Sequence, residues 1–278
     1  MAQSAHTVCP MSTTLCGSLS VHPTRTGQAM HDAGYRALGL DFKYIPFKVT
    51  NLERALLGMR GLGIRGFGVS YPFKEVVIPL IDELTRDAES MRAVNTIVNT
   101  NGRLVGHNTD CIGGVRALSE VCDLQQSSVL LLGAGGAARA IAWGLMRKKT
   151  RVTITNRTLA RAESLATETG ATAIAIDALF DLQVFDAIVN ATTLGMSGAE
   201  DGLPLDPNRI HPGQIVMDIV YKPLVTPWLQ AAAQRGARTI HGGRMLLHQA
   251  AAQFELYTGQ AAPIDAMESA LNTQLASP

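Results

Sequence analysis

The apolar residues of this chain form short runs, and several of these runs end at a glycine or a small polar residue. The clearest run is residues 129–132, V-L-L-L, which leads into G-A-G-G-A-A-R-A-I-A. A continuous apolar run is typical of a strand buried on both faces of a parallel sheet. The alanine-rich continuation favours a helix that begins near Gly136. The pattern predicts a buried strand that turns into a helix through a glycine loop.

The rest of the second half repeats this alternation of strand and helix. A helix over residues 111–121 precedes the glycine loop, and Pro227 predicts the start of another helix. Such alternation is typical of a doubly wound α/β sheet, so we predict a Rossmann-type domain over residues 109–241. The apolar runs that predict its further strands are residues 152–155, 173–176, 186–190 and 215–220.

The first half predicts a β-α-β-α-β unit followed by a hairpin. Asn51 is expected to cap a helix that runs through Met59. The Asn101-Gly102 pair is the strongest hairpin signal in the chain. The predicted strands are residues 14–19, 44–47, 66–70, 94–99 and 104–106.

The C-terminal tail is expected to return to the first half. Gly242 and Gly243 are interpreted as a hinge, followed by a helix over 245–257 and a final helix for which Asp265 and Glu268 resemble a capping box. We therefore predict an α/β protein of two domains. Its first domain is discontinuous and consists of residues 1–108 plus 242–278.

The glycine loop has the spacing of a dinucleotide-binding fingerprint, G-x-G-x-x-A. Gly133 permits a tight turn, Gly135 lets the backbone approach a pyrophosphate, and Ala138 allows close packing of helix on strand. The free amides of the following helix would face the anion. The alternative is an ordinary strand-to-helix turn.

The next strand end indicates which dinucleotide is bound. NAD-binding sheets place a carboxylate here for the ribose hydroxyl, and the stretch N-R-T-L-A-R at residues 156–161 has none. Arg157, Thr158 and Arg161 supply two cations and a hydroxyl for a 2′-phosphate, so NADP is predicted. The alternative is a pair of solvated arginines at a helix start.

Composition narrows the class of protein. The 278 residues carry a formal net charge of +1, with 46% hydrophobic and 17% charged residues, which is typical of a globular α/β protein. There is no basic block for nucleic acid, no apolar stretch long enough for a membrane helix and no signal-peptide pattern. The four cysteines and seven histidines show no metal-ligand spacing. We expect a cytoplasmic protein without a metal.

Several blocks together resemble the shikimate dehydrogenase family, in family order and over nearly the whole chain. They are V-S-Y-P-F-K-E, A-V-N-T-I, G-H-N-T-D, G-A-G-G-A-A-R, N-R-T-L-A-R, Y-K-P-L-V-T-P-W-L and M-L-L-H-Q-A-A-A-Q-F-E-L-Y-T-G. The resemblance implies an NADP-dependent enzyme that interconverts 3-dehydroshikimate and shikimate. It makes the discontinuous domain the catalytic, substrate-binding one.

The resemblance also implies roles for individual residues. Lys74 and Asp110 would form the proton relay that carbonyl reduction needs beside a hydride carrier. Ser70, Asn95, Tyr221 and Gln249 would bind the hydroxyl groups of a cyclic polyol. The residues expected to bind the cofactor are Gly133, Ala134, Gly135, Gly136, Ala137, Asn156, Arg157, Thr158, Arg161, Thr192, Ile219 and Gly242.

The chain departs from the family pattern where the substrate carboxylate is usually bound. The expected His-Ser-x-Ser-Pro element is missing, and either Ser18 with Ser20 or Thr24 with Thr26 supplies a hydroxyl pair, to which Arg25 adds a charge. Ser70 replaces the usual threonine, and Arg244 stands where a glycine often occurs.

These departures resemble the divergent shikimate dehydrogenase-like branch of the family. They leave quinate or aminoshikimate open as the substrate, and also a binding protein that turns over poorly and senses shikimate. The partner is a small molecule in each case, and the protein is expected to be a monomer or a homodimer.

Overall fold

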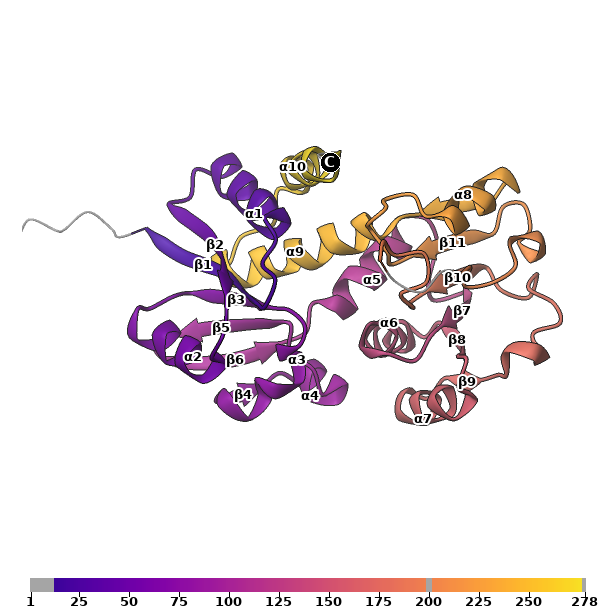
Figure 1. The fold of residues 1–278 in the computed structure, drawn as a ribbon, viewed down its shortest axis with the longest axis horizontal. Helices are drawn as coiled ribbons and strands as arrows, with labels where there is room; N and C mark the ends of the chain where they lie inside the picture. Colours follow the sequence, from indigo (N-terminus) through magenta and orange to yellow (C-terminus); the bar gives the residue numbers. More distant parts are fainter. Residues whose placement is uncertain (1–12, 199–201, 277–278) are drawn as a thin grey trace, which may run out of the picture.

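Two six-stranded sheets form the centres of two lobes, as drawn in the computed structural model (Figure 1). The structure describes residues 13–198 and 202–276, so Cys9 and the rest of the N-terminal extension lie outside it. In the described part of the chain, no helix is both long and apolar enough to cross a membrane.

The first sheet has the strand order β2-β1-β3-β5-β6-β4, and we call this half the substrate lobe. Its pairs β2-β1, β1-β3 and β6-β4 are parallel, whereas β3-β5 and β5-β6 are antiparallel. Its elements are β1 (Thr14–Ser20), α1 (Thr26–Ala37), β2 (Phe42–Lys48), α2 (Leu52–Gly61), β3 (Gly66–Val69), α3 (Phe73–Val76), η1 (Ile78–Leu80), β4 (Glu83–Leu84), α4 (Arg86–Met91), β5 (Thr96–Thr100) and β6 (Arg103–His107).

Local signals explain much of this lobe. The Asn51 side chain accepts a hydrogen bond from the Arg54 amide at 2.9 Å and so caps α2, as predicted. Asn101 and Gly102 both have positive φ, 53° and 87°, which suits the tight turn between β5 and β6. Along β1, Leu19 joins the core cluster that includes residues of α2, whereas Cys16 joins the cluster that includes residues of α9. This alternation places Ser18 and Ser20 on the same face as Cys16.

The second sheet has the order β12-β11-β10-β7-β8-β9, with every neighbouring pair parallel, and we call this half the nucleotide lobe. This is the doubly wound order predicted for the domain. All residues of β7 are buried, as expected for a central strand. Its elements are β7 (Ser128–Leu132), α6 (Gly136–Arg147), β8 (Arg151–Thr155), α7 (Leu159–Thr169), β9 (Thr172–Ala173), η2 (Ile176–Ala178), β10 (Ala187–Asn190), η3 (Pro207–Arg209), β11 (Ile215–Asp218), α8 (Pro227–Gln234) and β12 (Arg238–Ile240).

Two helices, α5 (Asp110–Ser119) and α9 (Gly242–Thr258), lie between the lobes and pack on each other (Figure 1). The last helix, α10 (Ile264–Ala276), packs on α1 of the substrate lobe. We propose residues 1–108 with 242–278, and residues 109–241, as the two domains, because the first sheet is built before α5 and the second sheet between α5 and α9.

Three sequence predictions about elements are wrong. Gly242 and Gly243 do not form a hinge but are the first two residues of α9. Position 242 is a glycine because of close packing: a Cβ there would lie 2.2 Å from the Ile219 carbonyl oxygen, so only glycine fits. The predicted strand 173–176 ends at Ala173, since Ile176 already belongs to η2. Asp265 lies inside the first turn of α10 and is not its cap.

Candidate active site

The catalytic candidates meet at one edge of the substrate-lobe sheet. The parallel strands β1 and β3 end at this edge, and the antiparallel β5 begins there. Lys74 lies in α3, directly after β3, and Asp110 begins α5, shortly after β6. Lys74 Nζ donates a hydrogen bond to Asp110 Oδ2 at 2.6 Å. The fold thus pairs an amine with a carboxylate, as a proton relay requires.

Asp110 lies at the start of α5 and accepts a hydrogen bond at each carboxylate oxygen. Its carboxylate lies in the first turn of α5, where the helix dipole stabilises a negative charge. Asn95 Nδ2 donates to Asp110 Oδ1 at 2.8 Å, so each carboxylate oxygen has its own donor. The side chain of Asp110 is 10% exposed and that of Lys74 is 35% exposed, which leaves the amine as the more accessible partner.

Asn95 is held more tightly by the protein than the sequence indicated. Its Oδ1 accepts hydrogen bonds from the Thr109 amide at 2.7 Å and from Thr96 Oγ1 at 2.8 Å. The residue is 1% exposed. In this structure Asn95 orients Asp110, and its binding to a substrate hydroxyl stays a prediction.

The other substrate candidates differ in accessibility. Ser20 is buried and its Oγ accepts from the His22 amide at 3.0 Å, while Ser18 is half-buried and Thr24 is exposed. Ser70 is exposed and continues the β1-β3 ladder, since its amide donates to the Leu19 carbonyl. Ser18, Ser20 and Ser70 thus lie at the edge that holds Lys74.

Gln249 and Tyr221 come from segments that follow the nucleotide-lobe strands. Gln249 lies on α9 and packs against α5, because a Cβ at Gly113 would lie 3.1 Å from the Gln249 Cβ. Tyr221 follows β11 and is 37% exposed.

Sequence reasoning missed a buried polar residue that supports this edge. Gln253 Nε2 donates to Thr96 Oγ1 at 3.0 Å and to the Asn95 carbonyl at 3.3 Å. Gln253 follows Gln249 by one helical turn on a mostly apolar helix, so the two amides share a face. This repeat of glutamine after one helical turn is the sequence pattern that could have revealed Gln253.

The glycine loop of the nucleotide lobe is shaped for close approach of a ligand. Gly133 has φ +112°, and a Cβ there would lie 3.0 Å from Thr192 Cγ2. At Gly135 and Gly136, a Cβ would meet nothing within 4 Å, so the space above the start of α6 is open. Backbone amides at a helix start bind phosphate well. The loop therefore fits a pyrophosphate group.

Four predicted cofactor residues line one pocket of about 200 Å³ beside this loop, namely Gly133, Asn156, Arg157 and Thr192. Of the others, Thr158 directly precedes α7 without a capping hydrogen bond from its side chain, and Arg161 lies in the first turn, both exposed. Ala134 lies in the glycine loop and Ala137 in the first turn of α6. Ile219 and Gly242 touch each other where β11 meets α9, outside the residues that line this pocket.

A buried polar network, which the sequence did not reveal, fixes the loop that carries Thr192. Thr192 Oγ1 donates to Asn190 Oδ1 at 2.7 Å, and Asn190 Nδ2 donates to Asp218 Oδ1 at 3.0 Å. Thr226 Oγ1 donates to the other oxygen of Asp218 at 2.8 Å. Burial raises the pKa of Asp218 above its ordinary value. The sequence pattern that could have indicated this network is an acidic residue, Asp218, at the end of an apolar strand.

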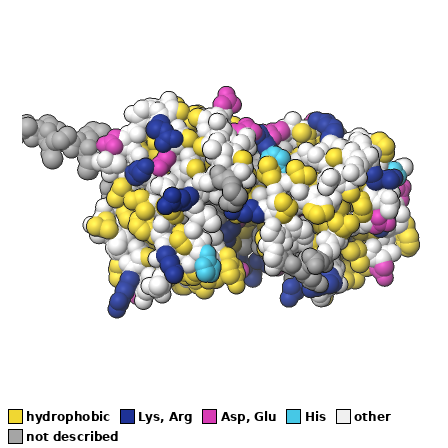
Figure 2. All heavy atoms as spheres, turned by 45° about the horizontal axis from the view of Figure 1, so that its top comes forward, with side chains coloured by type: hydrophobic (Ala, Val, Ile, Leu, Met, Phe, Trp, Pro, Cys, Tyr) yellow, Lys and Arg dark blue, Asp and Glu magenta, His cyan; other side chains and the backbone are white. Residues whose placement is uncertain are grey.

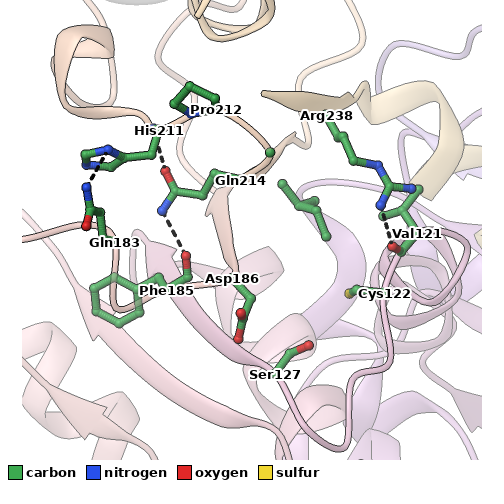
Figure 3. Close-up of a pocket in the computed structure, with 12 residues that line it drawn as sticks. Val121, Cys122, Ser127, Gln183, Phe185, Asp186, His211, Pro212, Gln214 and Arg238 are labelled. Carbon is green, nitrogen blue, oxygen red and sulfur yellow. Dashed lines mark hydrogen bonds between the residues drawn. The ribbon is translucent and has the colours of Figure 1, made fainter. Parts of the chain in front are cut away.

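A wider cavity of about 610 Å³ lies at the opposite ends of the nucleotide-lobe strands (Figure 3). Its polar side chains already bind the protein: Gln214 Nε2 donates to the Phe185 carbonyl at 2.8 Å, and Arg238 donates to the Val121 carbonyl at 3.1 Å. Ligands of such sheets bind at the carboxyl ends of the strands. The cavity in Figure 3 is therefore not the candidate active site.

The surface between the lobes is hollowed, and basic side chains gather in this hollow (Figure 2). Such a distribution favours anionic ligands. Among the described residues, no group of three or more acidic, histidine or cysteine side chains is arranged to hold a metal ion.

Three stretches of this chain match known protein families. Residues 24–97 match the shikimate dehydrogenase substrate binding domain, residues 116–196 match shikimate / quinate 5-dehydrogenase, and residues 242–271 match the shikimate 5′-dehydrogenase C-terminal domain. The shikimate dehydrogenase (NADP⁺) of Desulforamulus reducens is 43% identical over 263 residues, which cover 89% of this chain and 90% of the relative.

Solved structures agree with these matches. The shikimate 5-dehydrogenase of Thermus thermophilus in complex with NADP(H) and shikimate is 32% identical, with a TM-score of 0.86 over 94% of this chain and 100% of that one. The quinate dehydrogenase of Corynebacterium glutamicum in complex with NAD is 30% identical, with a TM-score of 0.83 over 94% and 99%. The chain belongs to the shikimate dehydrogenase family.

Proposed function

We propose that the protein is an NADP-dependent oxidoreductase that interconverts 3-dehydroshikimate and shikimate. The observation that carries this proposal is the hydrogen bond between Lys74 Nζ and Asp110 Oδ2, at the edge where Ser18, Ser20 and Ser70 also lie. The names of the curated relatives, shikimate dehydrogenase (NADP⁺), support the same reaction.

Lys74 and Asp110 have separate roles in this proposal. The ammonium group of Lys74 donates a proton to the oxygen of the carbonyl as it becomes an alcohol, and takes the proton back in the reverse direction. Asp110 holds that ammonium group in place and accepts a hydrogen bond from a neighbouring substrate hydroxyl. When bound, NADP supplies or accepts the hydride.

NADP would be held by the glycine loop and by the residues after β8. The open space at Gly135 and Gly136 supports a pyrophosphate there. Arg157, Thr158 and Arg161 would bind the 2′-phosphate, a proposal supported by the lack of a carboxylate at this strand end.

The substrate ring would be bound by Ser70, Asn95, Tyr221 and Gln249. Its carboxylate would be bound by Ser18 with Ser20 or by Thr24 with Thr26, beside Arg25. Alanine variants of Ser20 and Thr24 separate these pairs, because the variant that removes a carboxylate ligand should raise KM for shikimate while kcat changes little.

The test of the function is the formation of NADPH from NADP⁺ with shikimate, followed by absorbance. We expect turnover with shikimate and a higher kcat/KM with NADP⁺ than with NAD⁺. Absence of turnover with shikimate, quinate and aminoshikimate would overturn the proposal.

A second candidate is a relative that acts on quinate or aminoshikimate, or that binds shikimate with little turnover. The altered carboxylate loop between Ser18 and Thr26 favours it. A kcat/KM for quinate or aminoshikimate above that for shikimate identifies the first case. Binding of shikimate by calorimetry with negligible turnover identifies the second, the sensor.

We also infer a cytoplasmic location and a monomer or homodimer. The inferred location is supported by Cys16, Cys111 and Cys122, which are free thiols. Light scattering of the purified protein decides between the two assembly states.

A further inference from the structure

Charged side chains from three helices meet at the start of α9. Arg244, the third residue of α9, donates from Nε to Glu120 Oε2 at 2.9 Å and from a terminal nitrogen to the other oxygen of the same carboxylate. Its second terminal nitrogen donates to Glu268 of α10. His248, one turn along α9, also contacts Glu120, at 2.8 Å. Arg244 thus joins α9 to the end of α5 and to α10.

The charges of Arg244 and Glu120 are each unfavourable for the dipole of their own helix. A cation in the first turn of α9 faces the positive end of that helix dipole, and an anion at the C-cap of α5 faces a negative end. Each charge is stabilised by the other, and the hydrogen bonds that Arg244 donates to Glu120 raise the pKa of the guanidinium above its ordinary value. The two-pronged contact fixes position as well as charge, because a guanidinium group is rigid and planar.

The helix that Arg244 fixes carries two amides toward the candidate active site. α9 packs on Gly113 of α5 so closely that a Cβ at Gly113 would lie 2.7 Å from the Met245 carbonyl oxygen and 3.1 Å from the Gln249 Cβ. Gln253 bonds to Thr96 and Asn95, and Asn95 bonds to Asp110. A shift of α9 along α5 would therefore move Gln249 relative to Asp110.

We propose that Arg244 is a positioning residue that sets the register of α9 on α5 and thereby holds Gln249 in place for substrate binding. This inference rests on the proposed function, in which Gln249 binds a hydroxyl group of the substrate. In this role Arg244 acts through α9, and its own contacts are with Glu120 and Glu268.

The test compares Arg244→Met, Gln249→Ala and the double variant in steady-state kinetics. We expect Arg244→Met to raise KM for shikimate about tenfold, with kcat little changed and NADPH affinity retained, because it weakens ground-state binding through Gln249. In the Gln249→Ala background the same change should have no further effect on KM, since residues that act through one contact are not additive. Arg244→Lys should restore part of the loss.

The matched control is Arg116→Met. It removes a separate ion pair between the same two helices, Arg116–Glu255 at 3.1 Å, and should leave KM unchanged. Additive effects of Arg244→Met and Gln249→Ala overturn the inference, as does an equal rise in KM from Arg116→Met. If Arg244→Met does not fold, Glu120→Gln, which weakens the contact between Arg244 and the end of α5, should raise KM by a smaller factor, and an unchanged KM then overturns the inference.

Hydrogen exchange separates this inference from the proposed function. Amides of residues 245–253 should exchange faster in Arg244→Met than in Arg116→Met, whatever the substrate is. A wild-type protein without turnover refutes the proposed function alone, and equal exchange in the two variants refutes the positioning role alone.

Discussion

The candidate ligand sites of the two lobes consist of different chemical groups. The nucleotide lobe offers mainly backbone, in the loop of Gly133, Gly135 and Gly136, with a few side chains from the next strand end. The substrate lobe offers side chains that hydrogen-bond one another, centred on Lys74 and Asp110. A backbone site tolerates side-chain changes but not changes in backbone shape, whereas a side-chain site depends on single functional groups.

The hydrophobic cores of the two lobes also differ in the kinds of side chain that they contain. The main cluster of the nucleotide lobe is made almost entirely of Val, Leu, Ile, Ala and Met. Under the substrate site lies an aromatic cluster in which His31 stacks on Tyr44 at 4.4 Å and lies near Tyr35 and Tyr257. Within the part of the chain that the structure describes, the two ring nitrogens of His31 and the hydroxyls of Tyr35 and Tyr257 form no hydrogen bond. Protonation of His31 would therefore place a charge inside the core of the substrate lobe.

The largest effect is expected where one functional group carries the reaction. Lys74→Ala should lower kcat with shikimate about 10³-fold, within the range for loss of a general acid. The dissociation constant of NADPH, measured by fluorescence, should change little because the cofactor site lies in the other lobe.

Lys48→Ala is the matched control, since Lys48 is an exposed lysine of the same lobe. It should retain full activity. Normal turnover by Lys74→Ala would remove Lys74 from the mechanism.

The second effect concerns the aromatic core. Burial lowers the pKa of His31 from 6.5 to about 4, so the folded protein keeps this ring neutral where the unfolded chain protonates it. The contribution of neutral His31 to the unfolding free energy is fully present above pH 6.5 and is lost as the pH falls to about 4. The loss amounts to about 3 kcal/mol of unfolding free energy.

Urea unfolding of the wild type and of His31→Phe at pH 7, 5.5 and 4 measures this loss. The Phe variant should lose about 3 kcal/mol less than the wild type between pH 7 and 4, and His22→Phe, at an exposed histidine, should behave like the wild type. Parallel pH profiles for His31→Phe and the wild type would show that His31 does not carry the difference.

The contrast between the lobes also explains what the sequence alone could predict. The nucleotide site comes from two contiguous stretches, at residues 133–138 and 156–161, whose spacing sets their shape, so its strand, loop and helix were predicted nearly at their true limits. Lys74, Asn95 and Asp110 are brought together by mixed strand pairing, which no local pattern specifies. Their role came from the family resemblance.

Residues that act through others were the hardest to predict. Gln253 was not singled out in the sequence at all, and Arg244 was noted only as a departure from the family pattern. Their partners, Thr96 and Glu120, lie more than a hundred residues away along the chain. Gly242 was misinterpreted as a hinge because a glycine required by close packing and one required by backbone freedom look alike in a sequence.

The third effect tests the junction between the lobes. Gly242→Ala should lower the unfolding free energy by about 2 kcal/mol, because its Cβ would meet the Ile219 carbonyl at 2.2 Å and the backbone must shift. Gly58→Ala is the control, as a Cβ there meets nothing within 4 Å, and alanine in a helix should stabilise by up to about 1 kcal/mol. Equal effects at the two glycines in urea unfolding would contradict the close contact at Gly242.

The smallest effect is expected at the side chains of the nucleotide site. Arg157→Ala should raise KM for NADP⁺ about tenfold, or about 1.4 kcal/mol, because it removes one of several groups proposed for the 2′-phosphate. KM for NAD⁺ should not change, since NAD⁺ lacks that phosphate. Arg151→Ala, at an exposed arginine that begins the same strand, should change neither. Equal losses with both cofactors would mean that Arg157 supports the loop rather than the phosphate, and recognition of the 2′-phosphate would then be left to Thr158 and Arg161.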